Sequence, residues 1–260
     1  MIRAMWSAAS GMNAQQMLID VMANNLANVN STGFKKSRTE FEDLFYQIYK
    51  EKGAPTAAGG SSPVGIEVGM GTRPVATQKI FTQGDIIQTN NDMDIAIEGD
   101  GFFQMIQDDV EVYTRDGAFK IDVDGYIVNA RGDRLQPEVS VPSTTADVII
   151  DKNGRITCLD RGGNTVASAE IQIYTFTNPA GLKSIGGNCY TPTPSSGDPV
   201  QGVPGTENFG TLSQGYLEMS NVDAIEEMIN MIMGQRAYEI NSKTIRTADT
   251  MLQTAASIVR

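Results

Sequence analysis

The sequence predicts an α+β fold in which two terminal, coiled-coil-like helices pack together and a mainly β domain with a β-insert lies between them. Three observations support this prediction. Apolar residues recur every seven positions near both ends of the chain, which is the spacing of a coiled-coil stripe. Between the ends, short β-rich runs alternate with Asp-Gly and Asn-Gly pairs, and such pairs favour hairpin turns.

The first helix is expected over residues 2–27, which contain several alanines and methionines and no proline. The asparagine-rich run at residues 24–34 ends it, because asparagine and glycine tolerate left-handed backbone. Its apolar stripe is formed by Met5, Met12, Ile19, Met22 and Leu26.

Residues 38–50 carry a second, shorter amphipathic pattern of helical spacing. Phe41, Leu44, Phe45 and Ile48 would share one face of such a helix. We therefore expect residues 1–45 to form an N-terminal helical domain. The Gly-, Ala-, Ser- and Pro-rich residues 51–63 (EKGAPTAAGGSSP) have the composition of a loop or linker.

The middle of the chain is predicted to be β-structure. Residues 64–136 together with 201–216 are assigned to a central β domain, and residues 137–200 to a more separable β-insert. Hairpin turns are expected at Asp124-Gly125 and at Asn153-Gly154.

The last segment, residues 217–260, is predicted to contain a long helix over residues 221–258, capped by Ser220 or Asn221. The apolar stripe changes phase near Gly234, which indicates a bend, a stutter or a change of partner. Stripes of this kind require a partner surface, supplied by the other end of the chain, by other copies, or by both. The stripe positions are Val222, Ile225, Ile229, Ile232, Tyr238, Ile245 and Leu252.

Composition excludes several function classes. The chain has no histidine, which excludes a Ser-His-Asp triad and histidine-ligated zinc. Cys158 and Cys189 are the only cysteines, and they form either one disulfide or two small buried hydrophobes. The net charge of −11 argues against nucleic acid as a partner. The N-terminus lacks the apolar core of a secretory signal, and no apolar run is long enough to span a bilayer.

No motif identifies a catalytic, cofactor or metal site. Residues 122–125 (DVDG) lack the ligand spacing of a calcium loop, so a hairpin turn is the better interpretation. Residues 131–133 (RGD) are interpreted as an ordinary polar turn. Carboxylates are numerous enough that the glycosidase pair of a secreted carbohydrate-active enzyme stays open as an alternative.

Several long, ordered runs resemble bacterial flagellar rod and hook proteins. Residues 23–35 (ANNLANVNSTGFK) resemble their N-terminal signature, and residues 215–223 (GYLEMSNVD) with 235–239 (QRAYE) resemble their C-terminal helix. Residues 83–85 (QGD), 101–103 (GFF) and 113–117 (YTRDG) match in the middle, so the resemblance covers almost the whole chain. The total length and residues 71–77 (GTRPVAT) are most similar to the distal rod members.

The resemblance implies a structural subunit, not an enzyme, that self-assembles through its helical ends into a tube transmitting torque from motor to hook. It adds Asn25, Asn28, Gly33 and Phe34 to the self-assembly residues. It also implies a rod-specific segment at residues 46–63, marked by Tyr46, Gly53, Pro55 and Pro63.

The implied partners are further copies of the chain in a homo-polymer, proximal rod proteins, the hook protein, ring proteins that act as a bushing, and the flagellar type III export apparatus. No nucleic acid, small-molecule substrate, metal or cofactor is implied. The implied location is the basal body, in a rod that spans the periplasm to the outer membrane, after export without a cleaved signal. Another axial position, in the proximal rod or the hook, stays open.

Overall fold

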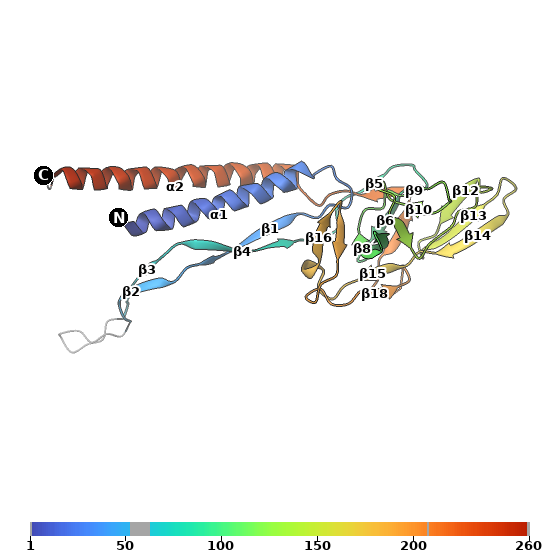
Figure 1. Cartoon of the computed structure of the whole chain (residues 1–260), viewed down its shortest axis with the longest axis horizontal. Helices are drawn as coiled ribbons and strands as arrows, with labels where there is room; N and C mark the ends of the chain where they lie inside the picture. Colours follow the sequence, from blue (N-terminus) through green and yellow to red (C-terminus); the bar gives the residue numbers. More distant parts are fainter. Residues whose placement is uncertain (1, 53–62, 207, 259–260) are drawn as a thin grey trace. The chain divides into compact units, whose positions relative to one another are not determined.

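The computed structural model describes residues 2–52, 63–206 and 208–258, and the chain divides into two compact units (Figure 1). The first unit combines three segments, Met1–Leu26, Ser37–Gln78 and Asp223–Arg260. The second unit consists of Ala27–Lys36 and Lys79–Val222. The two ends of the sequence therefore meet within one unit, which is one of the pairings that the sequence left open.

Two antiparallel helices dominate the first unit, α1 (Ile2–Ala27) and α2 (Ala224–Ile258), which confirms the predicted helices at the two ends (Figure 1). Asn25 near the end of α1 is bonded to Glu227 near the start of α2. Gly11 of α1 lies against Asn241, farther along α2. Neither these helices nor any other described one combines the length and apolar character that a membrane crossing requires.

The start of α2 differs from the prediction. The helix begins at Ala224, and its N-cap is Asp223, whose carboxylate accepts hydrogen bonds from the backbone N–H groups of Ile225 (2.8 Å) and Glu226 (3.2 Å). Ser220 and Asn221 lie outside the helix. The helix is continuous through Gly234.

Residues 38–50 are not helical, and the predicted N-terminal helical domain at 1–45 is wrong beyond α1. They form β1 (Ser37–Asp43) and β2 (Tyr46–Lys50). β1 pairs with β4 (Thr72–Lys79), and β2 pairs with β3 (Ile66–Gly69). The segment is rich in aromatic residues, which favour strands, and the strands that pair with it, β3 and β4, lie between Ile66 and Lys79, so a local helical pattern does not reveal the pairing.

The second unit is β-structure. A seven-stranded sheet has the order β16-β17-β8-β7-β11-β10-β9, beside the smaller sheets β12-β13-β14, β15-β18, β19-β6 and β20-β5. The elements of the second unit, in chain order, are β5 (Ile86–Gln88), β6 (Ile95–Glu98), β7 (Phe103–Gln107), β8 (Val110–Thr114), β9 (Lys120–Ile121), β10 (Ile127–Val128), β11 (Arg134–Gln136), β12 (Asp147–Ile150), β13 (Arg155–Leu159), β14 (Thr165–Glu170), β15 (Ile173–Thr175), the 3-10 helix η1 (Pro179–Gly181), β16 (Lys183–Gly186), β17 (Cys189–Thr191), β18 (Val200–Gly202), β19 (Thr211–Gln214) and β20 (Tyr216–Glu218).

Both predicted hairpins are confirmed. Asp124-Gly125 joins the antiparallel strands β9 and β10, and Asn153-Gly154 joins β12 and β13. Within the predicted β-insert at 137–200, β12, β13 and β14 form a sheet of their own, but the insert as a whole is not separate, because β17 pairs with β8 and so joins the seven-stranded sheet. The insert's Ile156 is also buried in the same core as Phe103.

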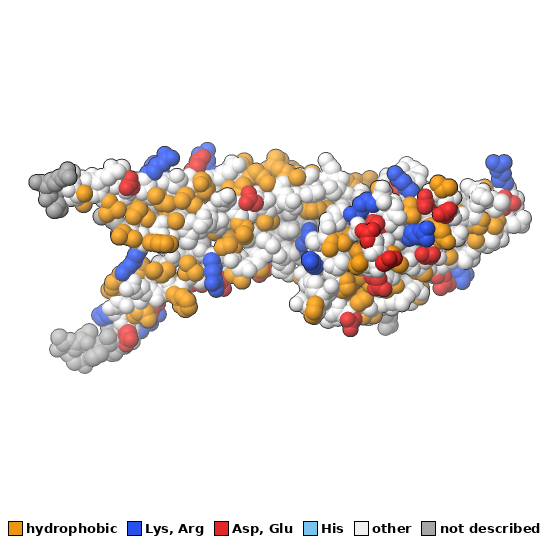
Figure 2. Space-filling view, in the orientation of Figure 1, with side chains coloured by type: hydrophobic (Ala, Val, Ile, Leu, Met, Phe, Trp, Pro, Cys, Tyr) orange, Lys and Arg blue, Asp and Glu red, His pale blue; other side chains and the backbone are white. Residues whose placement is uncertain are grey.

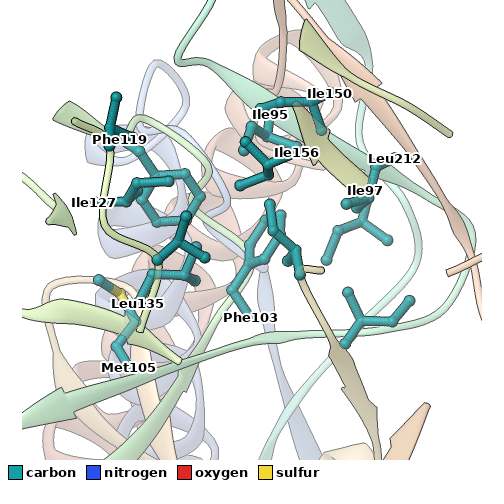
Figure 3. Close-up of a cluster of buried hydrophobic side chains, with 14 of the residues drawn as sticks. Ile95, Ile97, Phe103, Met105, Phe119, Ile127, Leu135, Ile150, Ile156 and Leu212 are labelled. Carbon is teal, nitrogen blue, oxygen red and sulfur yellow. The ribbon is translucent and has the colours of Figure 1, made fainter. Parts of the chain in front are cut away.

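Two clusters of buried hydrophobic residues hold the second unit together, and Figure 3 shows central side chains of the larger one. Phe103 packs edge to face on Phe119 with ring centroids 5.1 Å apart, and Ile95 and Ile97 of β6 lie in the same core. Cys158 and Cys189 are free and buried in it, which matches the interpretation as small hydrophobes.

Replacing Phe103 by alanine should lower the free energy of unfolding of the second unit by about 3–5 kcal/mol, because the substitution leaves a cavity in a fully buried site. Urea unfolding followed by near-ultraviolet circular dichroism measures the change. Val123→Ala is the control, since Val123 is 100% exposed and its removal should leave stability unchanged. Equal stability of both variants would contradict this account of the core.

Candidate assembly surface

Large apolar side chains are exposed along both helices and the β-ribbons of the first unit, and we call this set the assembly face. Figure 2 shows hydrophobic side chains spread over these elements. A monomer gains nothing by leaving so much apolar surface in water, so a surface of this kind marks a contact site. The set comprises Ile2, Trp6 and Met17 on α1; Ile225, Met228, Ile229, Ile232, Met233, Tyr238, Ile240, Met251 and Ile258 on α2; and Phe41, Phe45, Tyr46, Ile48, Tyr49, Val64, Ile66, Val68, Met70 and Val75 in and beside the ribbons.

The residues of the predicted apolar stripe of α2 differ in how far they are exposed. Ile225, Ile229, Ile232 and Tyr238 are exposed and belong to the assembly face. Ile245 and Leu252 are half-buried. Val222 is buried in the second unit, before the helix begins. In α1 the predicted residues Met5, Met12, Ile19, Met22 and Leu26 are all half-buried.

A different stripe of α2 faces α1, and sequence reasoning missed it. Glu227, Gly234, Asn241 and Ala248 recur at the same sevenfold spacing, but they are small or polar. Three of them are buried and Asn241 is half-buried. The glycines could have revealed this stripe, because glycine in a helix interior is unfavourable unless close packing requires it.

The two helices approach each other closely at their glycines. A Cβ atom on Gly11 would lie 2.9 Å from Nδ2 of Asn241, and a Cβ atom on Gly234 would lie 3.3 Å from a side-chain carbon of Ile19. A larger residue at Gly11 would displace the side chain of Asn241, and one at Gly234 would crowd the side chain of Ile19. Small residues therefore fill the contact inside the unit, and the bulky apolar residues of α2 point away from it.

Asn25 fixes the junction between α1 and β1. Its side-chain amide donates to the backbone oxygen of Ser37 and its side-chain oxygen accepts from the Ser37 N–H, both at 2.9 Å. The same amide donates to Oε1 of Glu227 on α2 at 3.3 Å. This predicted assembly residue is almost fully buried, and it ties together three elements of the first unit. Asn28, half-buried, accepts a hydrogen bond from the hydroxyl of Ser31 at 3.3 Å.

Gly33 and Phe34, two further predicted residues, anchor the loop of the second unit. Gly33 has φ = +64°, and a Cβ atom there would lie 2.5 Å from the backbone nitrogen of Asp116, so only glycine fits. Phe34 is buried, with Nζ of Lys79 4.8 Å from its ring centroid.

A buried ion cluster follows directly. Nζ of Lys35 lies 2.5 Å from Oε1 of Glu218 and donates to the backbone oxygen of Thr82 at 2.7 Å. Nη1 of Arg115 lies 3.6 Å from the other Glu218 oxygen, and the backbone N–H of Gly84 donates to Oε1. Burial lowers the pKa of Lys35, and the Glu218 carboxylate opposes that shift.

Sequence reasoning missed this cluster although all three charged residues lie inside the quoted runs. Lys35 ends residues 23–35, Arg115 lies in 113–117, and Glu218 lies in 215–223. One feature of the sequence could have indicated the cluster: each of three signature runs, which are distant from one another in the sequence, contains one of its charged residues. The two cations and the one carboxylate give the cluster a net charge of +1. All three side chains are buried together, away from water.

The predicted rod-specific segment is only partly described. Tyr46 and Pro63 are exposed, whereas Gly53 and Pro55 lie outside the described residues. Every residue of β2 is exposed, and so are most of β3. Among the described residues, no group of three or more Cys, Asp or Glu side chains is arranged to hold a metal ion.

Three family models match the chain. The flagella basal body rod protein model matches residues 5–35, the flagellar hook protein FlgE/F/G D1 domain matches 96–158, and the flagellar basal body rod FlgEFG protein C-terminal model matches 213–258. The chain is similar to proteins named flagellar basal-body rod protein FlgG. The one from Borreliella burgdorferi is 47% identical over 100% of both chains. The one from Buchnera aphidicola is 43% identical over 97% of this chain and 98% of its own, and the one from Bacillus subtilis is 35% identical over 100% of both.

Replacing Lys35 by methionine should destabilise the second unit by about 3–5 kcal/mol, because it leaves the buried Glu218 carboxylate without its closest cation. The matched control is Arg155→Met. Arg155 lies 3.5 Å from Glu170, but both side chains are exposed, so the loss should stay below about 1 kcal/mol. Chemical unfolding of the two variants measures the loss of stability in each case. Similar losses would show that the buried ion pair contributes no more to stability than the exposed one.

Proposed function

This chain belongs to the family of flagellar basal-body rod proteins, and from that membership we propose that its copies assemble into the distal rod, a helical tube that transmits motor torque to the hook. It is a structural subunit of the flagellar rod, located in the basal body. The tube, its distal position and its torque-bearing role are the proposal. The observation that carries it is the assembly face of the first unit.

The assembly face has the chemistry of a surface that is covered in the mature structure. It presents bulky apolar side chains on α2 and on the ribbons, while small and polar residues of α2 fill the contact of that helix with α1. Burial of apolar surface between copies supplies the driving force, at about 25 cal/mol per Å². In this arrangement first units form the wall of the tube and second units lie outside it.

Charge is distributed in a way that favours this arrangement. The first unit carries nine Lys and Arg against eleven Asp and Glu, a net charge of −2. The second unit carries eleven against twenty, a net charge of −9. First units can therefore pack densely with little repulsion, and the strongly acidic units repel one another where they have more room.

The ribbon of β2 and β3 supports a rod-specific role for residues 46–63. A two-stranded ribbon is marginally stable on its own in water, and here both of its strands are largely exposed. In the proposed rod this ribbon packs on neighbouring copies and stiffens the tube. The other proposed partners are proximal rod proteins, the hook protein, ring proteins and the flagellar type III export apparatus, with the rod spanning the periplasm to the outer membrane.

Replacing Ile229 by aspartate tests the proposal. Ile229 is 53% exposed on α2, so the single chain should fold as before, whereas every contact in the tube would bury an unpaired carboxylate. We expect unchanged circular dichroism of the purified chain and loss of rods and swimming in cells that carry the variant. The matched control is Val123→Asp, an equally drastic change at an exposed site of the second unit, which should leave rods intact.

Leu252→Asp extends the test to a half-buried position near the C-terminal end of α2. It too should stop rod growth while the second unit still folds. Cells that carry either helix variant and still build full-length rods would refute assembly through these helices.

Moderate salt should speed polymerisation of the purified chain, because the −9 second units repel one another and salt screens that repulsion over about 8–10 Å. Light scattering at increasing sodium chloride concentration follows the rate. A rate that falls steadily with salt would show instead that ion pairs between copies dominate the contact.

A further inference from the structure

The assembly face contains one side chain that protrudes and one hollow that could receive it, both in the first unit. Trp6 is the only tryptophan of the chain, and 69% of it is exposed on α1. Ile2, one turn earlier on the same helix, is exposed beside it. A large, rigid aromatic side chain left in water is the type of residue that most often dominates the energy of a protein contact.

The hollow is a groove of about 380 Å³ along α2, with Ala4 of α1 as one wall. We call it the helix groove. Its α2 lining includes Ile240, Ala248 and Met251, so its surface is mainly apolar. This volume is within the usual range of about 300–1,000 Å³ for pockets that bind small molecules or side chains.

The two threonines that line the groove are compatible with an apolar side chain in it, because their hydroxyl groups are already hydrogen-bonded. The hydroxyl of Thr244 donates to the backbone oxygen of Ile240, and the hydroxyl of Thr247 donates to the backbone oxygen of Lys243, both at 2.9 Å. Because both hydroxyls already donate hydrogen bonds within α2, neither of them needs a hydrogen-bond partner on the group that occupies the groove.

Trp6 cannot fill the groove of its own chain. Ala4, which lines the groove, is two residues from Trp6, and two residues of an α-helix are about 200° apart around the axis. The indole therefore leaves α1 on the side opposite to the groove wall. The two features lie at the same level along the helix pair because Trp6 is only two residues from that wall.

We propose that Trp6 of one copy inserts into the helix groove of a second copy. The proposal rests on the proposed homo-polymer and names one of its contacts. Since the protruding side chain and the groove are different surfaces of the same unit, the contact is heterologous: each copy offers a tryptophan to one neighbour and a groove to another. Such a contact continues from copy to copy.

The residues at the groove suit an indole ring. Met251 offers a thioether, which makes favourable contacts with aromatic rings. Lys243 lines the groove and makes no ion pair among the described residues, so its ammonium group is available to the electron-rich face of the indole. These two contacts favour tryptophan over an aliphatic side chain of similar size.

Photo-crosslinking in assembled rods tests the contact directly. The variant Trp6→p-benzoylphenylalanine keeps an aromatic side chain at position 6, and rods are grown from a mixture of nitrogen-isotope-labelled and unlabelled full-length chains. After irradiation, we expect cross-linked peptides that join position 6 of one isotopic form to residues 240–251 of the other. Links confined to one copy, or links between copies that map elsewhere, would overturn the inference while leaving the proposed rod intact.

The natural chain gives a second measurement, because its tryptophan fluorescence, excited at wavelengths where the tyrosines do not absorb, reports on Trp6 alone. On polymerisation the emission should move to shorter wavelength and lose its quenching by acrylamide. The groove variant Met251→Asp should abolish both changes, whereas Ile149→Asp, at an exposed site of the second unit, should preserve them. Polymers in which the emission stays that of an exposed indole would refute the contact, and a natural chain that forms no polymer would refute the proposed function as well.

Discussion

The close contact between α1 and α2 is the constraint on which the rest of the first unit depends. Gly11 and Gly234 let the helices approach, and the bond from Asn25 to Glu227 sets their register. On the α2 side this contact is filled by small and polar residues, which meet Ile19 and Asn25 of α1. The bulky side chains of α2, Ile229 among them, are left on the outside. The small and polar residues that make the pairing of the two helices specific thus also leave the large apolar side chains of α2 exposed in the monomer.

The second unit is held by different forces. Its aromatic and aliphatic core accounts for its stability, whereas the cluster of Lys35, Arg115 and Glu218 is a weak source of stability, because desolvating three charges offsets much of their attraction. The value of such a cluster lies in specificity. Lys35 enters from one segment of the chain, Arg115 follows β8, and Glu218 ends β20, so only one arrangement of these three segments satisfies the buried charges.

The sequence predicted what depends on local pattern and failed where distant residues decide. The two end helices and the hairpins at Gly125 and Gly154 follow from periodicity and turn chemistry, and they are confirmed. Residues 38–50 were misjudged because pairing with 66–79 outweighs a short helical pattern. The stripe of Glu227, Gly234, Asn241 and Ala248 was missed because a search for apolar repeats ignores helices that pack through small residues. Where an apolar stripe and a small-residue stripe share one helix, sequence alone does not say which faces inward.

The proposed contact between Trp6 and the helix groove would produce an open polymer, because the first unit is asymmetric. A single self-complementary patch would pair two copies and stop, since both patches would then be covered. Here the exposed Trp6 and the helix groove are different surfaces, and Trp6 and the Ala4 wall of the groove lie on nearly opposite sides of α1, so in the proposed contact a pair of copies would always retain one of each. Growth then ends only when chains run out or a different protein covers the last surface. In the proposed rod the contacts are made mainly by helices and paired strands, so twisting the rod would disturb many buried apolar contacts at once, which is the mechanical property that a shaft requires.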